Sequence, residues 1–114
     1  MITFPNAKIN LGLHITQKRK DGYHEIESCM VPIPLCDALE MILDKKPSWN
    51  VTGLEVPGDP KDNLILKAEK LLKKDFQGLP SLQIHLHKHI PMGAGLGGGS
   101  ADGAFALKLM NNLF

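Results

Sequence analysis

The feature of this sequence that most constrains its fold is the stretch PMGAGLGGGS at residues 91–100, where five of ten residues are glycine. Glycine loses more backbone freedom on folding than any other residue. A cluster this dense therefore indicates backbone with positive φ, or a close approach of another group to the main chain. Because the stretch lies between an apolar strand-like run and a helix-like run, the sequence predicts a strand, a glycine loop and a helix in succession.

A loop of this kind is suited to binding anions. The end of a strand, a glycine-rich turn and a helix N-terminus direct several backbone N–H groups and the positive end of a helix dipole to one point. Phosphate is the anion most often bound there. A flexible connector is the alternative, but a connector does not require glycine so close to a strand end and a helix start. We expect Ser100 to cap a helix from residue 101 to about 113.

Two familiar phosphate motifs can be compared with the loop. The Walker motif needs a lysine before its serine, whereas Ser100 follows Gly99. Residues 93–98 fit the dinucleotide fingerprint G-x-G-x-x-G, but its acidic ribose-binding partner, about 20 residues further on, would lie beyond residue 114. The residues before the loop also resemble paired strands rather than the first strand of a parallel βαβ unit. Dinucleotide binding stays open as an alternative.

The N-terminal third of the chain predicts a strand hairpin. Apolar and polar residues alternate over residues 7–16, which is typical of a strand with one buried face. Lys8 and Asn10 share the polar phase and so the same face, and we expect the apolar phase to face the core. Asp21-Gly22 predicts a turn, and residues 25–31 then predict a second strand paired with the first.

The remaining elements are predicted from similar signals. We expect strands at residues 39–43, 49–52 and 82–87, and a helix over residues 64–76 that is capped by Asp62 or Asn63 and ended by Gly78 and Pro80. Strands outnumber helices and fit an antiparallel or mixed arrangement. The sequence therefore predicts an α+β fold with a mixed or antiparallel sheet and helices, in one domain.

Composition narrows the classes of function. Thirteen basic and twelve acidic residues give a formal net charge of +1, which does not indicate nucleic-acid binding. Cys29 and Cys36 lack zinc-ligand spacing, which favours reduced thiols and a cytoplasmic protein. No apolar run approaches the ~20 residues of a membrane span, and no signal peptide is apparent. His85, His87 and His89 share one phase without an acidic or cysteine partner, so we expect an exposed strand face there rather than a metal site.

The loop and two further motifs resemble a known family. Residues 91–101, PMGAGLGGGSA, resemble the phosphate-binding motif of the GHMP kinases, the superfamily of galactokinase, homoserine kinase, mevalonate kinase and phosphomevalonate kinase. AKINL at residues 7–11 and DGYH at residues 21–24 narrow the resemblance to the branch that phosphorylates the 2-hydroxyl of 4-diphosphocytidyl-2-C-methyl-D-erythritol in non-mevalonate isoprenoid biosynthesis. The resemblance implies that residues 1–114 are the ATP-binding, N-terminal domain of such a kinase, with the fold of ribosomal protein S5 domain 2 and without the C-terminal domain.

The resemblance also implies roles for individual residues. Lys8 corresponds to the catalytic lysine, and the substrate-side residues are Asn10, Tyr23, which stacks on cytosine, and His24, which hydrogen-bonds it. ATP and Mg²⁺ are the implied cofactors, and a cytidine diphosphate-linked polyol is the implied acceptor. The implied ATP-binding residues are Asn63, Lys88, Pro91, Met92, Gly93, Ala94, Gly95, Leu96, Gly97, Gly98, Gly99, Ser100 and Ala101.

One expected part of the site falls outside these residues. The family's catalytic aspartate lies in a downstream Gly-Ala-Asp motif, so we expect the 114 residues alone to be inactive. The helix after Ser100 is apolar over much of its circumference, which favours self-association of the fragment. Two other classes stay open: a fragment of a dinucleotide-binding oxidoreductase, and a nucleotide-binding module without enzymatic activity.

Overall fold

The structure, a computed structural model, describes residues 1–114 and has the predicted α+β class. Its elements, in chain order, are β1 (Ile2–Thr3), β2 (Asn6–Lys18), β3 (His24–Cys36), β4 (Ala38–Leu43), β5 (Ser48–Gly53), the short 3-10 helix η1 (Pro60–Asp62), α1 (Leu64–Asp75), β6 (Leu82–Lys88) and α2 (Gly98–Leu113).

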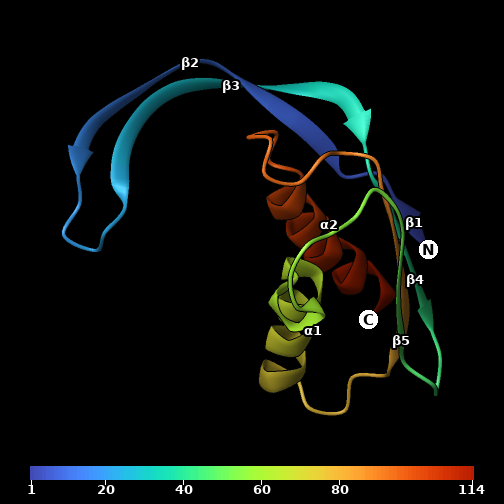
Figure 1. Ribbon diagram of the computed structural model, residues 1–114. Helices are drawn as coiled ribbons and strands as arrows, with labels where there is room; N and C mark the ends of the chain where they lie inside the picture. Colours follow the sequence, from blue (N-terminus) through green and yellow to red (C-terminus); the bar gives the residue numbers. More distant parts are fainter.

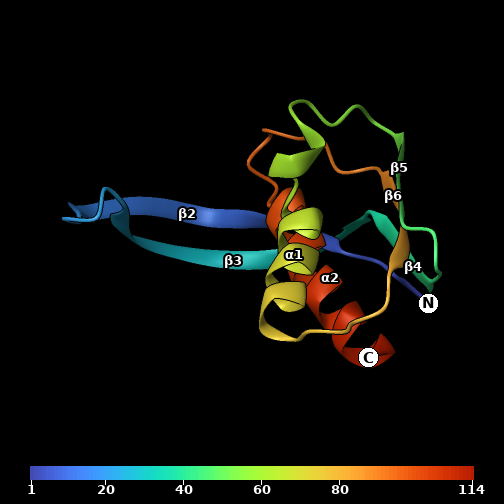
Figure 2. The same cartoon turned by 90° about the horizontal axis from the view of Figure 1, so that it is seen from below.

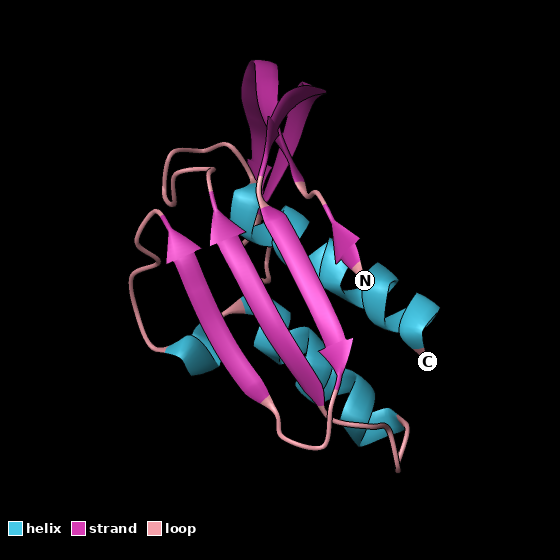
Figure 3. Cartoon of the chain, turned by 90° about the vertical axis from the view of Figure 1, so that its right-hand side faces the viewer, coloured by secondary structure: helices cyan, strands magenta, loops and turns pink.

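Four strands form a mixed sheet in the order β1-β4-β6-β5 (Figure 3). β4 pairs antiparallel with β1 and β6, whereas β5 and β6 are parallel. The chain passes through α1 between the two parallel strands, so this part of the molecule is a βαβ unit, which the sequence did not indicate. The glycine loop follows β6 and leads to α2, and therefore lies outside that unit.

Both helices cover the same face of the sheet, and the core lies between them and the strands (Figure 2). β4 and β6 contribute alternate residues, and each helix contributes one stripe. A Cβ at Gly103 would lie only 2.9 Å from the Cβ of Leu64, so glycine there lets α2 approach α1 closely. The buried core residues are Leu39, Met41, Ile65, Ala68, Leu82, Ile84, Leu86, Ala106, Leu109 and Met110.

The two helices begin differently. Of the two predicted caps of α1, Asn63 is the one observed, because its side-chain oxygen accepts a hydrogen bond of 2.9 Å from the amide of Ile65. The prediction that Ser100 caps α2 is wrong. α2 already begins at Gly98, with Gly97 at the N-cap position in left-handed backbone (φ 71°) and no side-chain cap. Glycine adopts this conformation without steric cost, so the helix can start directly after it.

β2 and β3 form a separate two-stranded hairpin that arches away from the body of the molecule (Figure 1). Its apolar phase was expected to face the core, and beyond Ala7 that expectation is wrong. Leu11, Leu13 and Ile15 are 59%, 55% and 64% exposed, respectively. The alternation correctly predicted a common face, but no helix or strand of these 114 residues packs on it.

Two negative findings concern the chain as described. Cys29 and Cys36 are both free thiols. Neither helix is long and apolar enough to cross a membrane.

Candidate functional site

The glycines of the loop are there for two physical reasons. Gly93, Gly95 and Gly97 have φ of 72°, 73° and 71°, a region that other residues adopt only with strain. Gly98 instead allows a close approach, because a Cβ there would lie 2.8 Å from Cγ2 of Ile90. The cluster thus combines both roles predicted from the sequence, in successive parts of one loop.

The loop presents a row of free donors. None of the backbone amides of residues 92–100 donates a hydrogen bond to another group of the chain, and the first amide of this region that does so is that of Ala101, to the carbonyl of Gly97. The last three of these amides belong to the first turn of α2, where the helix dipole is positive. A group that accepts several hydrogen bonds and carries negative charge would satisfy this row.

Lys8 joins β2 to the loop. Its backbone amide donates to the carbonyl of Leu96 at 2.9 Å. Its ammonium donates to the carbonyl of Gly95 at 2.9 Å and to Oδ1 of Asn10 at 2.6 Å. Lys8 and Asn10 therefore lie together, as their shared strand phase predicted, and the positive charge of Lys8 lies beside the glycine loop.

Asn10 connects this pair to the partner strand. Its amide nitrogen donates to the hydroxyl of Ser28 at 2.8 Å, and that hydroxyl donates to the carbonyl of Gly12 at 2.7 Å. Ser28 was not predicted as a site residue. Its hydroxyl could have been noticed only once the register of β2 and β3, with its bulges, was known.

Tyr23 and His24 lie at the far end of the hairpin (Figure 1). His24 pairs with Lys18, ten residues along β2 from Lys8, which corresponds to about 33 Å of extended strand. Tyr23 is 74% exposed. The structure does not bring these two residues to Lys8, and their roles stay predictions.

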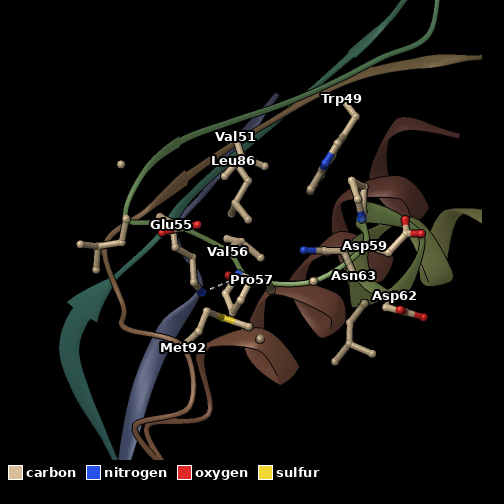
Figure 4. A pocket seen from close by; sticks show the side chains of 18 of the residues that line it. Trp49, Val51, Glu55, Val56, Pro57, Asp59, Asp62, Asn63, Leu86 and Met92 are labelled. Atoms are coloured by element: carbon tan, nitrogen blue, oxygen red, sulfur yellow. Dashed lines mark hydrogen bonds and ion pairs between the residues drawn. The ribbon is translucent and has the colours of Figure 1, made fainter.

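A cavity of about 460 Å³ lies next to the loop (Figure 4). It is enclosed by the sheet, by the segment between β5 and η1, and by the starts of α1 and α2. Asn63 and Lys88, both predicted on the ATP side, line it together with Met92 and Gly99 of the predicted loop. These four residues of the predicted ATP-side set lie around one cavity, and their roles stay predictions. Aliphatic and aromatic walls come from Trp49, Val51, Leu54, Val56, Leu64 and Leu86.

Lys88 reaches this cavity region from inside the protein. Its side chain is fully buried and its ammonium lies 2.6 Å from Asp37 and 2.8 Å from Asp102. Neither aspartate was predicted as a partner. One signal was available: Lys88 continues the phase of Leu82, Ile84 and Leu86, and a lysine on an apolar phase requires buried acceptors.

The two carboxyl groups of this cluster differ in their pKa values. Burial, followed by a hydrogen bond with Asp37, raises the pKa of Asp102 to about 7, although Lys88 opposes the rise. Burial also acts to raise the pKa of Asp37, but hydrogen bonds with Asp102, Lys88 and the amides of Ile90 and His89 outweigh it and hold that pKa below 3.8. Asp102 therefore exchanges its proton near neutral pH, whereas Asp37 is ionised there.

No group of three or more histidine, cysteine, aspartate or glutamate side chains is placed to hold a metal ion. The predicted strand face with His85 and His87 instead hydrogen-bonds Thr52 of the neighbouring β5, at 2.8 and 2.9 Å. His85 and His87 thus share one strand face, as predicted.

Known proteins with similar sequences are kinases. Residues 63–114 match the family model described as GHMP kinases N terminal domain. Over all of its length the chain is 59% identical to 4-diphosphocytidyl-2-C-methyl-D-erythritol kinase of Bacteroides fragilis, and 54% identical to the kinase of the same name from Cytophaga hutchinsonii. It covers 43% and 42% of these relatives, so the chain spans less than half the length of the curated relatives it matches.

Solved structures show the same similarity of fold. The whole chain superposes on 41% of a crystal structure of 4-(cytidine 5'-diphospho)-2C-methyl-D-erythritol kinase, with a TM-score of 0.83 and 34% identity. A phosphomevalonate kinase of Streptococcus pneumoniae shares the fold at a TM-score of 0.69, with 13% identity, over 99% of this chain and 36% of that one. The resemblance drawn from the three sequence motifs is confirmed.

Proposed function

We propose that this chain, which matches the GHMP kinase N-terminal family model over residues 63–114 and is similar to a 4-diphosphocytidyl-2-C-methyl-D-erythritol kinase over its whole length, is the ATP-binding part of a small-molecule kinase. The full-length protein would transfer a phosphoryl group from ATP to the 2-hydroxyl of 4-diphosphocytidyl-2-C-methyl-D-erythritol, in the non-mevalonate route to isopentenyl diphosphate. The observation that carries the proposal is the row of free amides at residues 92–100 with the ammonium of Lys8 bound beside it.

In this proposal the cavity binds the base of the nucleotide and the loop binds its phosphates. The base would enter the cavity, whose apolar walls suit an aromatic ring and whose lining includes the amide of Asn63 (Figure 4). The phosphates would then extend past Met92 and Gly99 to the free amides of the loop. Acceptor oxygens on a polyphosphate match these donors in chemistry and in charge.

The fit of Mg²⁺ is assessed from the donors present. The described residues offer no cluster of three acidic or histidine ligands, so the ion would be held mainly by the triphosphate. Bound in this way, Mg²⁺ supplies neutralisation of phosphate charge. Asp102, close to the start of α2, does not present an uncompensated charge to the phosphates, because Lys88 lies 2.8 Å from it.

Lys8 and Asn10 have distinct tasks in the transfer. The ammonium of Lys8 would stabilise the negative charge that is spread over the transferred group, which is the main demand that phosphoryl transfer makes on a protein. Asn10 accepts a hydrogen bond from that ammonium and so orients it. The aspartate that orients the acceptor hydroxyl is expected beyond residue 114, so the 114 residues by themselves would bind but not catalyse.

The hairpin would serve the acceptor. Tyr23 and His24, at its exposed end, are proposed to hold the cytosine ring by stacking and by hydrogen bonding. In this proposal the site extends from the loop along the hairpin. The reaction is proposed to take place between small molecules in the cytoplasm, with neither a nucleic acid nor a membrane as partner. Residues 1–114 then form the N-terminal domain of a two-domain enzyme.

The test uses the purified full-length protein with Mg²⁺-ATP and 4-diphosphocytidyl-2-C-methyl-D-erythritol. We expect ADP release coupled to a new phosphomonoester signal in ³¹P NMR, and no turnover with homoserine or phosphomevalonate. Lys8→Met should abolish turnover, whereas Lys70→Met, at an exposed lysine of α1 outside the proposed site, should leave it unchanged.

Other outcomes separate the alternatives. Stabilisation by a nicotinamide dinucleotide and not by ATP would point to an oxidoreductase, and ATP binding without turnover of any acceptor would point to a binding module. A turnover that survives Lys8→Met would remove Lys8 from the catalytic role, whichever acceptor is used.

A further inference from the structure

The buried cluster of Asp37, Lys88 and Asp102 lies behind the glycine loop. Lys88 and Asp37 have fully buried side chains, and that of Asp102 is 4% exposed. Placing three ionisable groups out of contact with water is costly unless they satisfy one another. A surface ion pair does not carry this cost, because its charges stay in contact with water.

Asp37 fixes the segment that enters the loop. It lies between β3 and β4, and one of its oxygens, Oδ1, accepts hydrogen bonds from the amides of His89 at 2.6 Å and Ile90 at 2.8 Å. These two residues directly follow β6. The other oxygen, Oδ2, accepts a hydrogen bond of 2.6 Å from Lys88, the last residue of β6. Asp37 thereby holds three successive residues of the chain just before the loop begins.

Asp102 fixes the segment that leaves the loop. It lies in the first turns of α2 and accepts a hydrogen bond of 2.8 Å from the same ammonium of Lys88. The two ends of the loop also pack directly on each other, since a Cβ at Gly98 would lie 2.8 Å from Cγ2 of Ile90 and 3.1 Å from Nζ of Lys88. Lys88 is therefore a strut between the beginning and the end of the glycine loop.

The strut is also coupled to the strand that carries Lys8. The amide of Asp37 donates to the carbonyl of Pro5 at 2.9 Å, immediately before β2. Further along β2, the amide of Lys8 donates to the carbonyl of Leu96 within the loop. Asp37 thus contacts, through its own atoms, both the entry of the loop and the start of the strand that bears Lys8.

We propose that Asp37 is a positioning residue for nucleotide binding: with Asp102 it holds Lys88 as a buried strut that sets the shape of the glycine loop, so that the amides of residues 92–100 face one ligand. This inference rests on the proposed ATP site. It assigns Lys88 a task behind the loop, because its ammonium donates to two buried protein carboxylates. Asp37 touches no substrate and acts through Lys88 and the loop backbone.

The central variant is Asp37→Asn in the full-length protein, which keeps the shape of the side chain and removes its charge. The amides of Lys8 and Ala101 bind loop carbonyls, so their hydrogen exchange reports on the anchoring of the loop. We expect both to exchange about tenfold or more faster, the size of effect that follows from loss of a hydrogen bond to a charged group. Ladder amides between β4 and β6 should change much less.

A second readout is ATP affinity. Asp37→Asn should raise the Kd for Mg²⁺-ATP by about tenfold or more, while the KM for the acceptor stays unchanged. Glu40→Gln is the matched control, because Glu40 is the same type of charge on the adjoining strand β4 and forms no ion pair. It should alter neither the exchange rates nor the Kd.

The two readouts separate this inference from the proposed function, since exchange is measured without nucleotide. Faster exchange at Lys8 and Ala101 supports the strut even if ATP is not the ligand. Unchanged exchange together with unchanged ATP affinity in folded Asp37→Asn protein would overturn the inference. If that variant does not fold, Asp102→Ala, which removes the second acceptor of Lys88 and keeps the Asp37–Lys88 pair, is measured in the same way, and wild-type values in it would also overturn the inference.

Discussion

The β2–β3 hairpin and the sheet that contains β6 have the same alternation of apolar and polar residues, yet they bury it differently. In β6, Leu82, Ile84 and Leu86 are at most 2% exposed beneath the two helices. In β2, the corresponding phase is more than half exposed from Leu11 onward. The comparison teaches that alternation predicts which side chains share a face, whereas burial depends on whether another element packs on that face.

Equal truncations on the two strands test this comparison with the largest expected effect. Leu86→Ala in β6 should lower the free energy of unfolding by about 2–5 kcal/mol, because it leaves a cavity in a packed core. Leu13→Ala in β2 should lower it by less than about 1 kcal/mol, since that side chain is already half exposed. Urea unfolding of the two variants measures both values. Similar losses would show that the hairpin face is covered in solution.

The buried Asp102 of α2 and the exposed Glu27 of the hairpin should differ in how they change the free energy of unfolding with pH. Asp102 lies against Lys88 and Asp37 and has a pKa of about 7, against an ordinary value of 3.8. The folded state therefore binds more protons than the unfolded state between these pH values, so the free energy of unfolding falls as pH rises from about 4 to 7 and is level above. We expect a fall on the order of 1–4 kcal/mol.

Asp102→Asn removes this fall, and Glu27→Gln, on the exposed hairpin, should retain it. Urea unfolding at pH 5, 6, 7 and 8 gives the three profiles, and their differences cancel the contribution of the histidines. Asp37 acts in the opposite direction. Its pKa is lowered in the folded state, so it contributes stability above its ordinary pKa of 3.8, and this contribution is lost as the pH falls below that value. Parallel profiles for wild type and Asp102→Asn would contradict the raised pKa of Asp102.

Two glycines with similar backbone separate conformational strain from a steric effect on the site. Gly97 in the loop and Gly22 in the hairpin turn both have positive φ, 71° and 90°. Valine is strained at either position, by about 1–2 kcal/mol. A Cβ at Gly97 also lies 3.0 Å from Cε of Lys8, whereas one at Gly22 meets nothing within 4 Å.

Gly97→Val should therefore raise the Kd for ATP by about tenfold or more, and Gly22→Val should leave it unchanged. Isothermal titration calorimetry on both full-length variants, checked for folding by circular dichroism, gives the comparison. Wild-type affinity in folded Gly97→Val protein would remove the loop from the ATP site.

The last prediction concerns self-association, and its variants should have the smallest effect on stability. The sequence attributed self-association of the 114 residues to α2, but that helix buries Ala106, Leu109 and Met110 in the core. The exposed apolar phase of β2 is the better candidate. Leu13→Ser should change stability by less than about 0.5 kcal/mol and reduce association seen by light scattering, whereas Leu107→Ser on α2 should not. The reverse result would return the contact to the helix.

Local signals predicted much of this molecule. The approximate positions of β2 to β6 and of the two α-helices, a cap at Asp62 or Asn63 and the pairing of Lys8 with Asn10 follow from patterns within a few residues, and the structure confirms them with Asn63 as the cap. The short strand β1 was not predicted. The start of α2 was misjudged because Gly97 and Ser100 are both suitable N-terminal residues. Left-handed backbone at Gly97 decided between them, and that conformation depends on how the loop is held.

By itself, the sequence determined that the chain has a glycine-rich loop between a strand and a helix, and that Lys8 shares a strand face with Asn10. These properties depend on residue type and on spacing of a few residues. Only the tertiary structure decided that Lys88 is buried between two aspartates, because its partner Asp37 lies 51 residues away along the chain and the pair forms only when β6 pairs with β4. The same holds for the exposed face of the hairpin, since the burial of a strand is a property of its neighbours.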